Sequence, residues 1–241
     1  MKRWFMLMAV VLTLAMAGSA LAQGDNTPLA YGETVEGEVS DAQFEIPYQF
    51  TGAEGDVIHA RMVVDDSGEF YEPSLILLDA DNSVVASYDG WYEATLLTPL
   101  PADGEYTLLA SRVGGRTGTD AGNYTLTLDL LSGVTTGEPL TGEMSNEDVV
   151  LYAVPADVPF TLEFERVSGD FAPELTVNVL GEFGEFEVIG ALYGQTIRKL
   201  SIDVEPDAER AVDFYVIQLA QSQWDWNYEP VTVEYTLTFT Q

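Results

Sequence analysis

Two groups of acidic residues carry the oxygen atoms that a calcium ion requires. Their members are Asp65, Asp66, Glu69 and Glu72 around one glycine-containing turn, and Asp79, Asp81 and Asn82 at the next turn. Calcium takes about six to eight oxygen ligands, and neighbouring acidic loops can supply them. The spacing is not that of an EF-hand, and an acidic coat that keeps the protein soluble is the simpler interpretation. Calcium is therefore a candidate cofactor, bound at one weak site near these turns.

Nucleophilic and zinc-dependent catalysis both require residues that this chain has in short supply. The protein contains one histidine, His59, and no cysteine. A nucleophilic serine or cysteine needs a base within hydrogen-bond reach, and zinc needs several His or Cys ligands. His59 falls beside Arg61 on the polar face of a predicted strand, so we expect it to be solvated. Paired carboxylates could serve a glycosidase, but nothing marks the cleft that such an enzyme needs, and we expect no enzymatic activity.

Large aromatic residues beside polar ones form the second candidate site. The two groups are Trp91 and Tyr92, and Trp224, Trp226 and Tyr228. The first group follows a turn at Asp89 and Gly90, and the second alternates with polar residues, which places its rings on one face of an extended segment. Exposed rings beside polar groups suit stacking on sugars or a protein-binding hot spot. Burial at the edge of the fold or at a domain junction is the alternative.

The elements that would hold these residues are β-strands. From residue 33 onward, apolar and polar residues alternate with a period of two in nearly every stretch. The apolar faces lie in 44–50, 58–64, 124–130, 160–164 and 231–239. Leu75 to Leu78 is apolar throughout, as in a strand covered on both sides. Turn signals such as Asp103-Gly104 separate the segments, so the pattern predicts an all-β fold of the sandwich or jelly-roll type.

The first 22 residues have the features of a cleavable signal peptide. Lys2 and Arg3 precede an uncharged run from Trp4 to Met16, and small residues lead to a cleavage position before Gln23. The run is shorter than the roughly 20 residues that span a bilayer, so we expect cleavage and no membrane insertion afterwards. The mature protein is expected to be secreted, either to the extracellular space or to the cell envelope.

The net charge excludes two classes of partner. Asp and Glu number 40 against 9 Lys and Arg, and the formal net charge of −31 becomes −33 once Lys2 and Arg3 are cleaved off. A surface this negative repels phosphates, so nucleic acid and anionic lipid are poor partners. Because there is no cysteine to form disulfides, stability must come from buried apolar surface, and 46% of the residues are hydrophobic.

The chain repeats itself once, at an offset of 100 to 111 residues. Four pairs of segments match in order, namely 37–40 with 142–145, 72–75 with 172–175, 106–110 with 215–219, and 124–128 with 235–239. Duplication of one module, followed by changes in loop length, produces such a series. We therefore expect two domains, at 29–131 and 138–241, joined by a short link of small residues.

Several segments of the first module carry a family resemblance. They are Gly32–Gly37, which opens the module, an apolar strand and acidic turn at Pro73–Asn82, a Pro-Ala-Asp-Gly stretch before a tyrosine in Leu100–Leu108, and the closing Gly122–Leu128. Together they resemble the bacterial pre-peptidase C-terminal domain over about residues 29–131. The resemblance implies a secreted β-sandwich of the kind appended to extracellular proteases and collagenases. The second module, 138–241, lacks several of these marks and is interpreted as a divergent copy.

These features predict a secreted, non-catalytic accessory protein that recognises an extracellular protein or polysaccharide, with calcium as a candidate aid. The alternative is a structural component of the cell envelope or matrix that associates with itself, and a carboxylate-dependent hydrolase comes third. Binding requires exposed aromatic rings. Self-association requires strand edges that are free to pair or a flat apolar patch.

Overall fold

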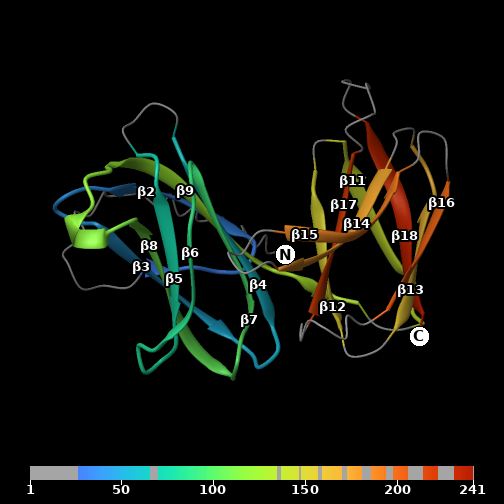
Figure 1. Ribbon diagram of the computed structural model, residues 1–241, viewed down its shortest axis with the longest axis horizontal. Coiled ribbons are helices and arrows are strands. Elements are labelled where there is room, and N and C mark those ends of the chain that lie inside the picture. The colour runs from blue at the N-terminus through green and yellow to red at the C-terminus, as the bar shows by residue number, and fades with distance from the viewer. Residues whose placement is uncertain are drawn as a thin grey trace, which may run out of the picture.

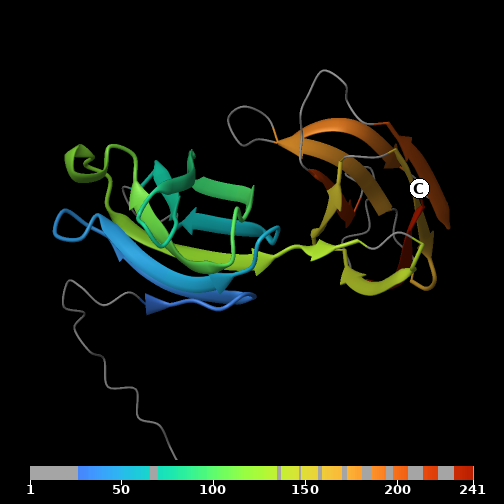
Figure 2. The same cartoon turned by 90° about the horizontal axis from the view of Figure 1, so that it is seen from below.

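The computed structural model describes two β-sandwiches that follow one another along the chain (Figures 1 and 2). The described residues are 27–65, 70–134, 137–146, 148–156, 159–169, 173–180, 186–193, 198–205, 214–221 and 231–240. The predicted signal peptide at 1–22 lies outside them. In these ranges no helix is long and apolar enough to cross a membrane.

The first sandwich packs a five-stranded sheet against a four-stranded sheet. In spatial order, the five-stranded sheet contains β1 (Thr27–Pro28), β3 (Glu45–Gly52), β8 (Gly104–Arg112), β5 (Pro73–Leu78) and β6 (Val84–Asp89). The four-stranded sheet contains β2 (Glu33–Val39), β9 (Gly122–Leu130), β4 (Val57–Val64) and β7 (Glu93–Pro99). A 3₁₀ turn, η1 (Gly115–Thr117), follows β8. Every pairing is antiparallel except that of β1 with β3.

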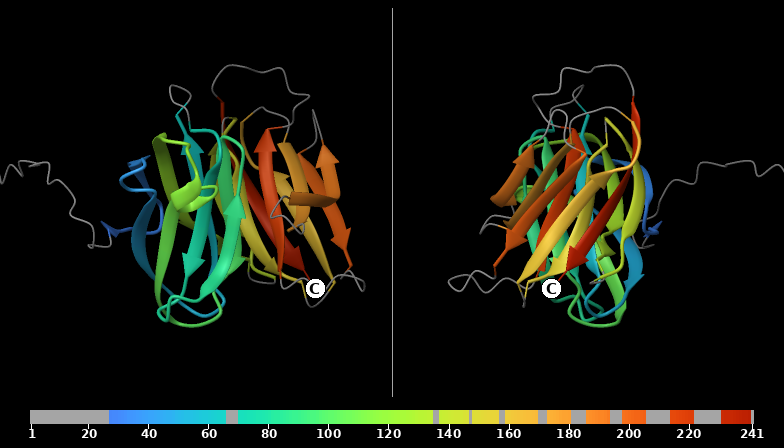
Figure 3. Two further views of the ribbon diagram at one scale, coloured as in Figure 1. Left: turned by 60° about the vertical axis from the view of Figure 1, so that its left-hand side comes forward. Right: turned by 90° about the vertical axis from the view of Figure 1, so that its right-hand side faces the viewer.

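The second sandwich repeats this topology strand for strand, which confirms the predicted tandem all-β architecture. Figure 3 shows the ribbon from two further sides. Its five-stranded sheet contains β10 (Ser132–Gly133), β12 (Val150–Pro155), β17 (Phe214–Gln221), β14 (Pro173–Leu180) and β15 (Phe186–Tyr193). Its four-stranded sheet contains β11 (Leu140–Ser145), β18 (Thr232–Thr240), β13 (Phe160–Arg166) and β16 (Lys199–Val204). The short strands that begin the two sandwiches, β1 and β10, lie just before the domain starts expected at 29 and 138.

Both copies have a β-bulge at the same place on one edge of the five-stranded sheet. The register shifts between Leu77 and Leu78 where β5 pairs with β6. It shifts between Val177 and Asn178 where β14 pairs with β15. A bulge bends and twists an edge strand, which hinders that strand from pairing with another chain. The irregularity of this edge therefore recurs in the two copies along with the strand order.

Each sandwich has its own core, formed by the apolar faces that the period of two predicts. Two details differ from the sequence-based expectation. Leu75 and Leu77 are buried, whereas Ile76 and Leu78 are only partly buried, so β5 is fully covered on one face. The expectation of two covered faces was wrong because only the inner face of a sandwich sheet packs against the other sheet. Leu130, at the end of β9 beside the link, is 41% exposed.

A tyrosine pair connects the two sheets inside each core. The hydroxyl groups of Tyr48 on β3 and Tyr124 on β9 share a hydrogen bond of 2.9 Å. Burial raises the pKa of Tyr124, so this buried pair stays neutral. Gly37 on β2 lies opposite Tyr124 and leaves room for its ring. The second copy repeats the arrangement with Tyr152, Tyr235 and Gly142.

The two sandwiches contact each other through a small apolar cluster beside their link. Its buried members are Val57, Leu97 and Leu131 from the first sandwich, and Ala153 and Val216 from the second. The cluster is much smaller than either core. Domains joined by so small a contact are expected to fold and unfold as separate units.

Candidate functional site

The structure brings Trp91 and Tyr92 together with a third ring, Tyr71, in what we call the aromatic patch. Trp91 and Tyr92 lie between β6 and β7, and Tyr71 lies shortly before β5. The exposed fractions are 64% for Trp91, 41% for Tyr92 and 37% for Tyr71. These rings therefore belong to the surface and not to the core. The other predicted group, Trp224, Trp226 and Tyr228, lies outside the described residues.

The three rings contact one another in a defined geometry. Tyr71 and Trp91 are nearly parallel, with an angle of 19° between their planes and 6.0 Å between their centroids. Tyr92 stands edge-on to both, at 81° to Tyr71 and 86° to Trp91, with both centroid distances at 5.5 Å. Edge-to-face contacts of this kind are favourable for aromatic pairs. Tyr92 therefore supports two rings whose faces point in nearly the same direction.

Backbone hydrogen bonds tie the aromatic patch to the neighbouring strands. The Tyr92 N–H donates to the Tyr71 carbonyl oxygen (2.8 Å), and the Tyr92 carbonyl oxygen accepts from the Val64 N–H (3.0 Å). The Gly90 N–H donates to the Pro73 carbonyl oxygen (3.0 Å). Tyr92 has a φ of +62°, a left-handed conformation that costs a bulky L residue about 1–2 kcal/mol. The surrounding bonds hold it in this strained conformation.

Asp120 fixes the segment that carries Tyr71. One oxygen of the Asp120 carboxylate, Oδ2, accepts hydrogen bonds from the backbone N–H groups of Tyr71 (2.9 Å) and Glu72 (3.0 Å). Asp120 lies in the loop between η1 and β9, so this contact joins two segments that are distant in sequence. Two hydrogen bonds to one charged acceptor restrict the backbone just before β5. The position of the Tyr71 ring therefore depends on Asp120.

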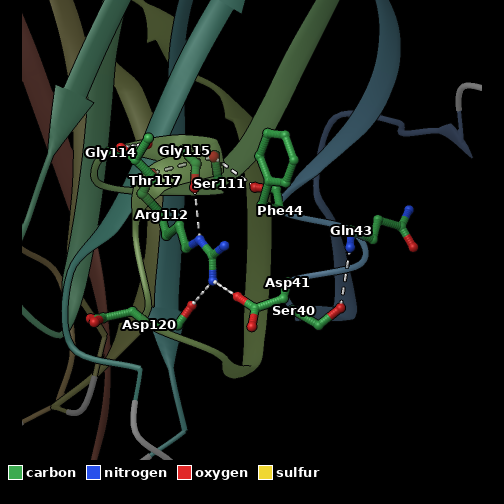
Figure 4. A network of polar contacts seen from close by, with 10 residues as sticks. All are labelled: Ser40, Asp41, Gln43, Phe44, Ser111, Arg112, Gly114, Gly115, Thr117 and Asp120. Atoms are coloured by element: carbon green, nitrogen blue, oxygen red, sulfur yellow. Dashed lines mark hydrogen bonds and ion pairs between the residues drawn. The ribbon is translucent and has the colours of Figure 1, made fainter.

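Asp120 is in turn held by a buried arginine at the end of β8 (Figure 4). The Arg112 side chain is 1% exposed. Its Nε donates to the Gly115 carbonyl oxygen (2.8 Å), and its Nη1 donates to the Asp120 carbonyl oxygen (2.7 Å) and to Asp41 Oδ1 (3.0 Å). The Phe44 ring lies 6.0 Å from the guanidinium carbon, within range of a cation–π contact. Arg112 therefore joins the β2–β3 and β8–β9 connections, and through Asp120 it supports the segment that carries Tyr71.

The acidic residues predicted to bind calcium fall at opposite ends of one strand. Asp65 and Glu72 precede β5, and Asp79 and Asp81 follow it. A strand of six residues spans about 20 Å, whereas calcium ligands lie about 2.4 Å from the ion, so one ion cannot bind both groups. Asp66 and Glu69 lie outside the described residues, among which no three acidic or histidine side chains converge as metal ligands.

Asp79 has a structural role in the turn between β5 and β6. Its Oδ1 accepts hydrogen bonds from the backbone N–H groups of Asp81 (2.9 Å) and Ser83 (2.8 Å). Asn82, inside this turn, has a φ of +60°, which asparagine tolerates better than most residues. Asp79 therefore shapes the turn through Oδ1, and calcium binding at this turn stays a prediction.

His59 is not the solvated residue that its place on a polar strand face suggested. Its side chain is 14% exposed, and Nδ1 lies 3.9 Å from Asp129 Oδ2. The expectation was wrong because the second sandwich lies over this face of the sheet, where Leu97 and Leu131 pack against Ala153. Burial lowers the pKa of His59, and the nearby Asp129 carboxylate opposes that shift. His59 is therefore neutral at pH 7.

The lowered pKa of His59 predicts a loss of stability in mild acid. The unfolded chain binds this proton with the ordinary pKa of 6.5, whereas the folded protein binds it less well. The free energy of unfolding should therefore be unaffected well above pH 6.5 and should fall as the pH drops below that value. Urea unfolding of the wild type and His59→Gln at pH 7.5 and 5.5 measures this. A difference between the two proteins that is the same at both pH values would contradict the prediction.

Sequence reasoning offered Trp91 and Tyr92 as candidate exposed rings, with burial as the alternative, but missed Tyr71, Asp120 and Arg112. Tyr71 follows Phe70 in a stretch where apolar and polar residues do not alternate. The sequence therefore did not show that Phe70 is buried and Tyr71 exposed. Asp120 and Arg112 act through contacts with residues 49 and 71 positions away. The nearest local signal was an arginine at the end of β8, after the uncharged run 106–111.

Comparison with known proteins finds similarity to this chain in structure only. The sequence matches no protein-family model, and no curated protein is similar to it. The chain is similar in structure to the pre-peptidase C-terminal domain of collagenase from Bacillus anthracis, with 13% identity, 44% of this chain and 95% of that chain covered, and a TM-score of 0.37. It is also similar to the PBSX exported protein XepA, with 10% identity, 88% and 89% coverage, and a TM-score of 0.29. Membership of the pre-peptidase C-terminal family remains a prediction.

Proposed function

We propose that this chain is a secreted, non-catalytic binding protein whose aromatic patch contacts an extracellular polysaccharide. The observation that carries the proposal is the exposure of Trp91, Tyr92 and Tyr71 in contact with one another. Rings of this size are usually buried, and clusters of them on a surface mark contact sites. The signal peptide predicted at 1–22 supports export.

The strained backbone of Tyr92 supports a functional role for the aromatic patch. A left-handed bulky residue lowers stability, and such residues gather at sites where ligands bind. Here the strain places the Tyr92 ring edge-on between Tyr71 and Trp91. Glycine would adopt the same φ without strain, but it has no ring. We infer that the side chain is kept for contact with a ligand.

A polysaccharide fits the aromatic patch better than a protein does. The apolar faces of sugar rings stack on flat aromatic rings, and Tyr71 and Trp91 offer two nearly parallel ones. Sugar hydroxyl groups need hydrogen-bond acceptors nearby, and the neighbouring Glu72 and Asp89 are exposed carboxylates. With a formal charge of −31, the protein favours a neutral or cationic polymer over an acidic one.

The alternative of a self-associating structural protein is less well supported. It requires strand edges that are free to pair with another copy. The β6 and β15 edges both carry a bulge, which bends the strand away from such pairing. Val84 and Val188, on these two edge strands, are exposed, and scattered exposed valines are usual on a protein surface.

Replacement of Trp91 by alanine tests the proposed function. We expect binding to the polysaccharide preferred by the wild type on a glycan and matrix-protein array to weaken about 30-fold, the loss of about 2 kcal/mol that is usual for a central aromatic contact. The free energy of unfolding should change by less than about 0.5 kcal/mol, because Trp91 is largely exposed.

Val84→Ala is the matched control, since Val84 is exposed to a similar extent on the same sandwich. It should leave binding unchanged. Retention of matrix proteins alone on the array, or equal retention of polysaccharide by both variants, would contradict the proposal.

A further inference from the structure

A groove of about 1020 Å³ runs between the two sandwiches, beside the apolar cluster that joins them. Its described walls come from β4, β6, β7 and the end of β9 on one side. On the other side they come from the start of β12, the two residues before it, and the middle of β17. None of the three rings of the aromatic patch lines it. The volume is at the upper end of the range for small-molecule sites, about 300–1000 Å³, so the groove has room for several residues of a peptide.

Among the described residues that line it, the groove has three carboxylates and one guanidinium group. Arg61 and Glu93 form a bidentate pair, with Nε and Nη2 each 2.7 Å from a carboxylate oxygen. This bonding raises the pKa of Arg61 and lowers that of Glu93, so the two charges balance each other. For the other two carboxylates, Asp129 and Asp148, the described lining residues include no further charged base.

The surroundings of Asp129 and Asp148 leave their negative charges available. The nearest base to Asp129 is His59, which burial keeps neutral at pH 7, and the Asp129 side chain is 46% exposed. Asp148 accepts one hydrogen bond through Oδ2, from the backbone N–H of Ser145 (2.7 Å). With His59 neutral, the described lining residues carry a net charge of −2, which an occupant with positive charge would balance.

Apolar side chains stand next to these carboxylates. Val149, adjacent to Asp148, is 59% exposed, and Leu130, adjacent to Asp129, is 41% exposed. Lysine and arginine side chains pack their aliphatic stems on such surfaces and extend their charged ends to an acid. The amide of Gln218 also lines the groove and can bond to a peptide backbone.

We infer that this groove is a second binding site, which takes an extended peptide segment that carries lysine or arginine side chains. Asp129 and Asp148 bind the cationic groups, and Leu130 and Val149 contact the aliphatic stems. The site is built by both sandwiches, so the duplication creates a surface that one module alone does not have. Its occupant is a different class of molecule from the polysaccharide proposed for the aromatic patch.

Fluorescence anisotropy with a labelled octapeptide of alternating lysine and alanine tests this inference on the whole mature chain. The same peptide with glutamine in place of lysine should bind at least tenfold more weakly, and so should a cationic glucosamine oligomer. The double variant Asp129→Asn/Asp148→Asn should weaken binding of the lysine peptide at least tenfold. Both changes keep the side-chain shape, and urea unfolding verifies that the variant folds.

The control is Glu45→Gln/Glu105→Gln, which removes the same charge from exposed positions on the five-stranded sheet of the first sandwich, away from the groove. It should change binding less than twofold. Val149→Lys, which adds a cation at the exposed edge of the groove, should weaken binding without altering either carboxylate. Equal losses in the two double variants would show that the peptide responds only to the overall charge. No effect of Val149→Lys would show that the peptide binds away from the groove. Either result would overturn the inference. Neither result would bear on the polysaccharide, since the probe contains no sugar.

Discussion

Replacement of Arg112 by leucine should lower the free energy of unfolding of the first sandwich by about 3 kcal/mol. The change removes hydrogen bonds to two backbone carbonyl oxygens, those of Gly115 and Asp120. Each buried acceptor left without a partner costs about 1–3 kcal/mol. Part of this loss of stability is offset, because the leucine variant no longer has to bury a charged guanidinium group, which costs desolvation energy in the wild type. Asp41 contributes little, since its side chain is 88% exposed and returns to water.

Arg116→Leu is the matched control, because Arg116 lies four residues further on in an exposed position. It should change stability by less than about 0.5 kcal/mol. Arg112→Lys keeps the charge but not the planar fork of donors, so we expect an intermediate loss of about 1–2 kcal/mol. Urea unfolding followed by tyrosine and tryptophan fluorescence measures all three variants. Equal stability of the Arg112→Leu and Arg116→Leu proteins would show that the Arg112 bonds contribute nothing net.

The Arg112 network also connects stability with the aromatic patch. Asp120 receives a hydrogen bond from Arg112 on its carbonyl oxygen and uses its carboxylate to hold the backbone of Tyr71 and Glu72. Loss of Arg112 should therefore loosen Tyr71 and weaken polysaccharide binding even under conditions where the protein remains folded. A preformed surface loses less entropy on binding than a mobile one. In this fold the rigidity of an exposed site depends on one buried cation.

The strands and their inward faces could be predicted because they depend on local patterns. Alternation along 58–64 places Ile58, Ala60 and Met62 in the core, as observed. The repeated segments predicted two sandwiches, and the strand order and the position of the edge bulge recur in both copies. A period of two fixes which face a residue occupies. It does not say what covers the other face.

The features that escaped prediction depend on which segments become neighbours in space. Tyr71 contacts Trp91 because β5 pairs with β6, and Asp120 reaches Tyr71 from a loop 49 residues away. His59 is covered because the second sandwich lies over the outer face of β4, which no local pattern signals. The acidic residues around β5 are close in sequence, but an extended strand separates their two groups. Calcium binding by one of these groups stays a prediction.

Replacement of Gly37 by alanine should destabilise the first sandwich by about 2–4 kcal/mol. An added Cβ would lie within 3.0 Å of three atoms of the Tyr124 side chain. The ring would have to move, which breaks its hydrogen bond to Tyr48 and strains a close-packed core. The usual small gain from replacing glycine in a strand, about 0.4–1 kcal/mol, is not enough to offset this.

Gly142→Ala should have the same effect on the second sandwich, where the added Cβ would lie within 3.0 Å of three atoms of Tyr235. Since the junction cluster is small, each variant should lower the unfolding temperature of one calorimetric transition and leave the other in place. The effects should add in the double variant, because the two sites share no contacts. Gly133→Ala, whose added Cβ meets nothing within 4 Å, should change neither transition. If one glycine replacement lowers both transitions equally, the sandwiches unfold as a single unit and the contact between them is stronger than its size indicates.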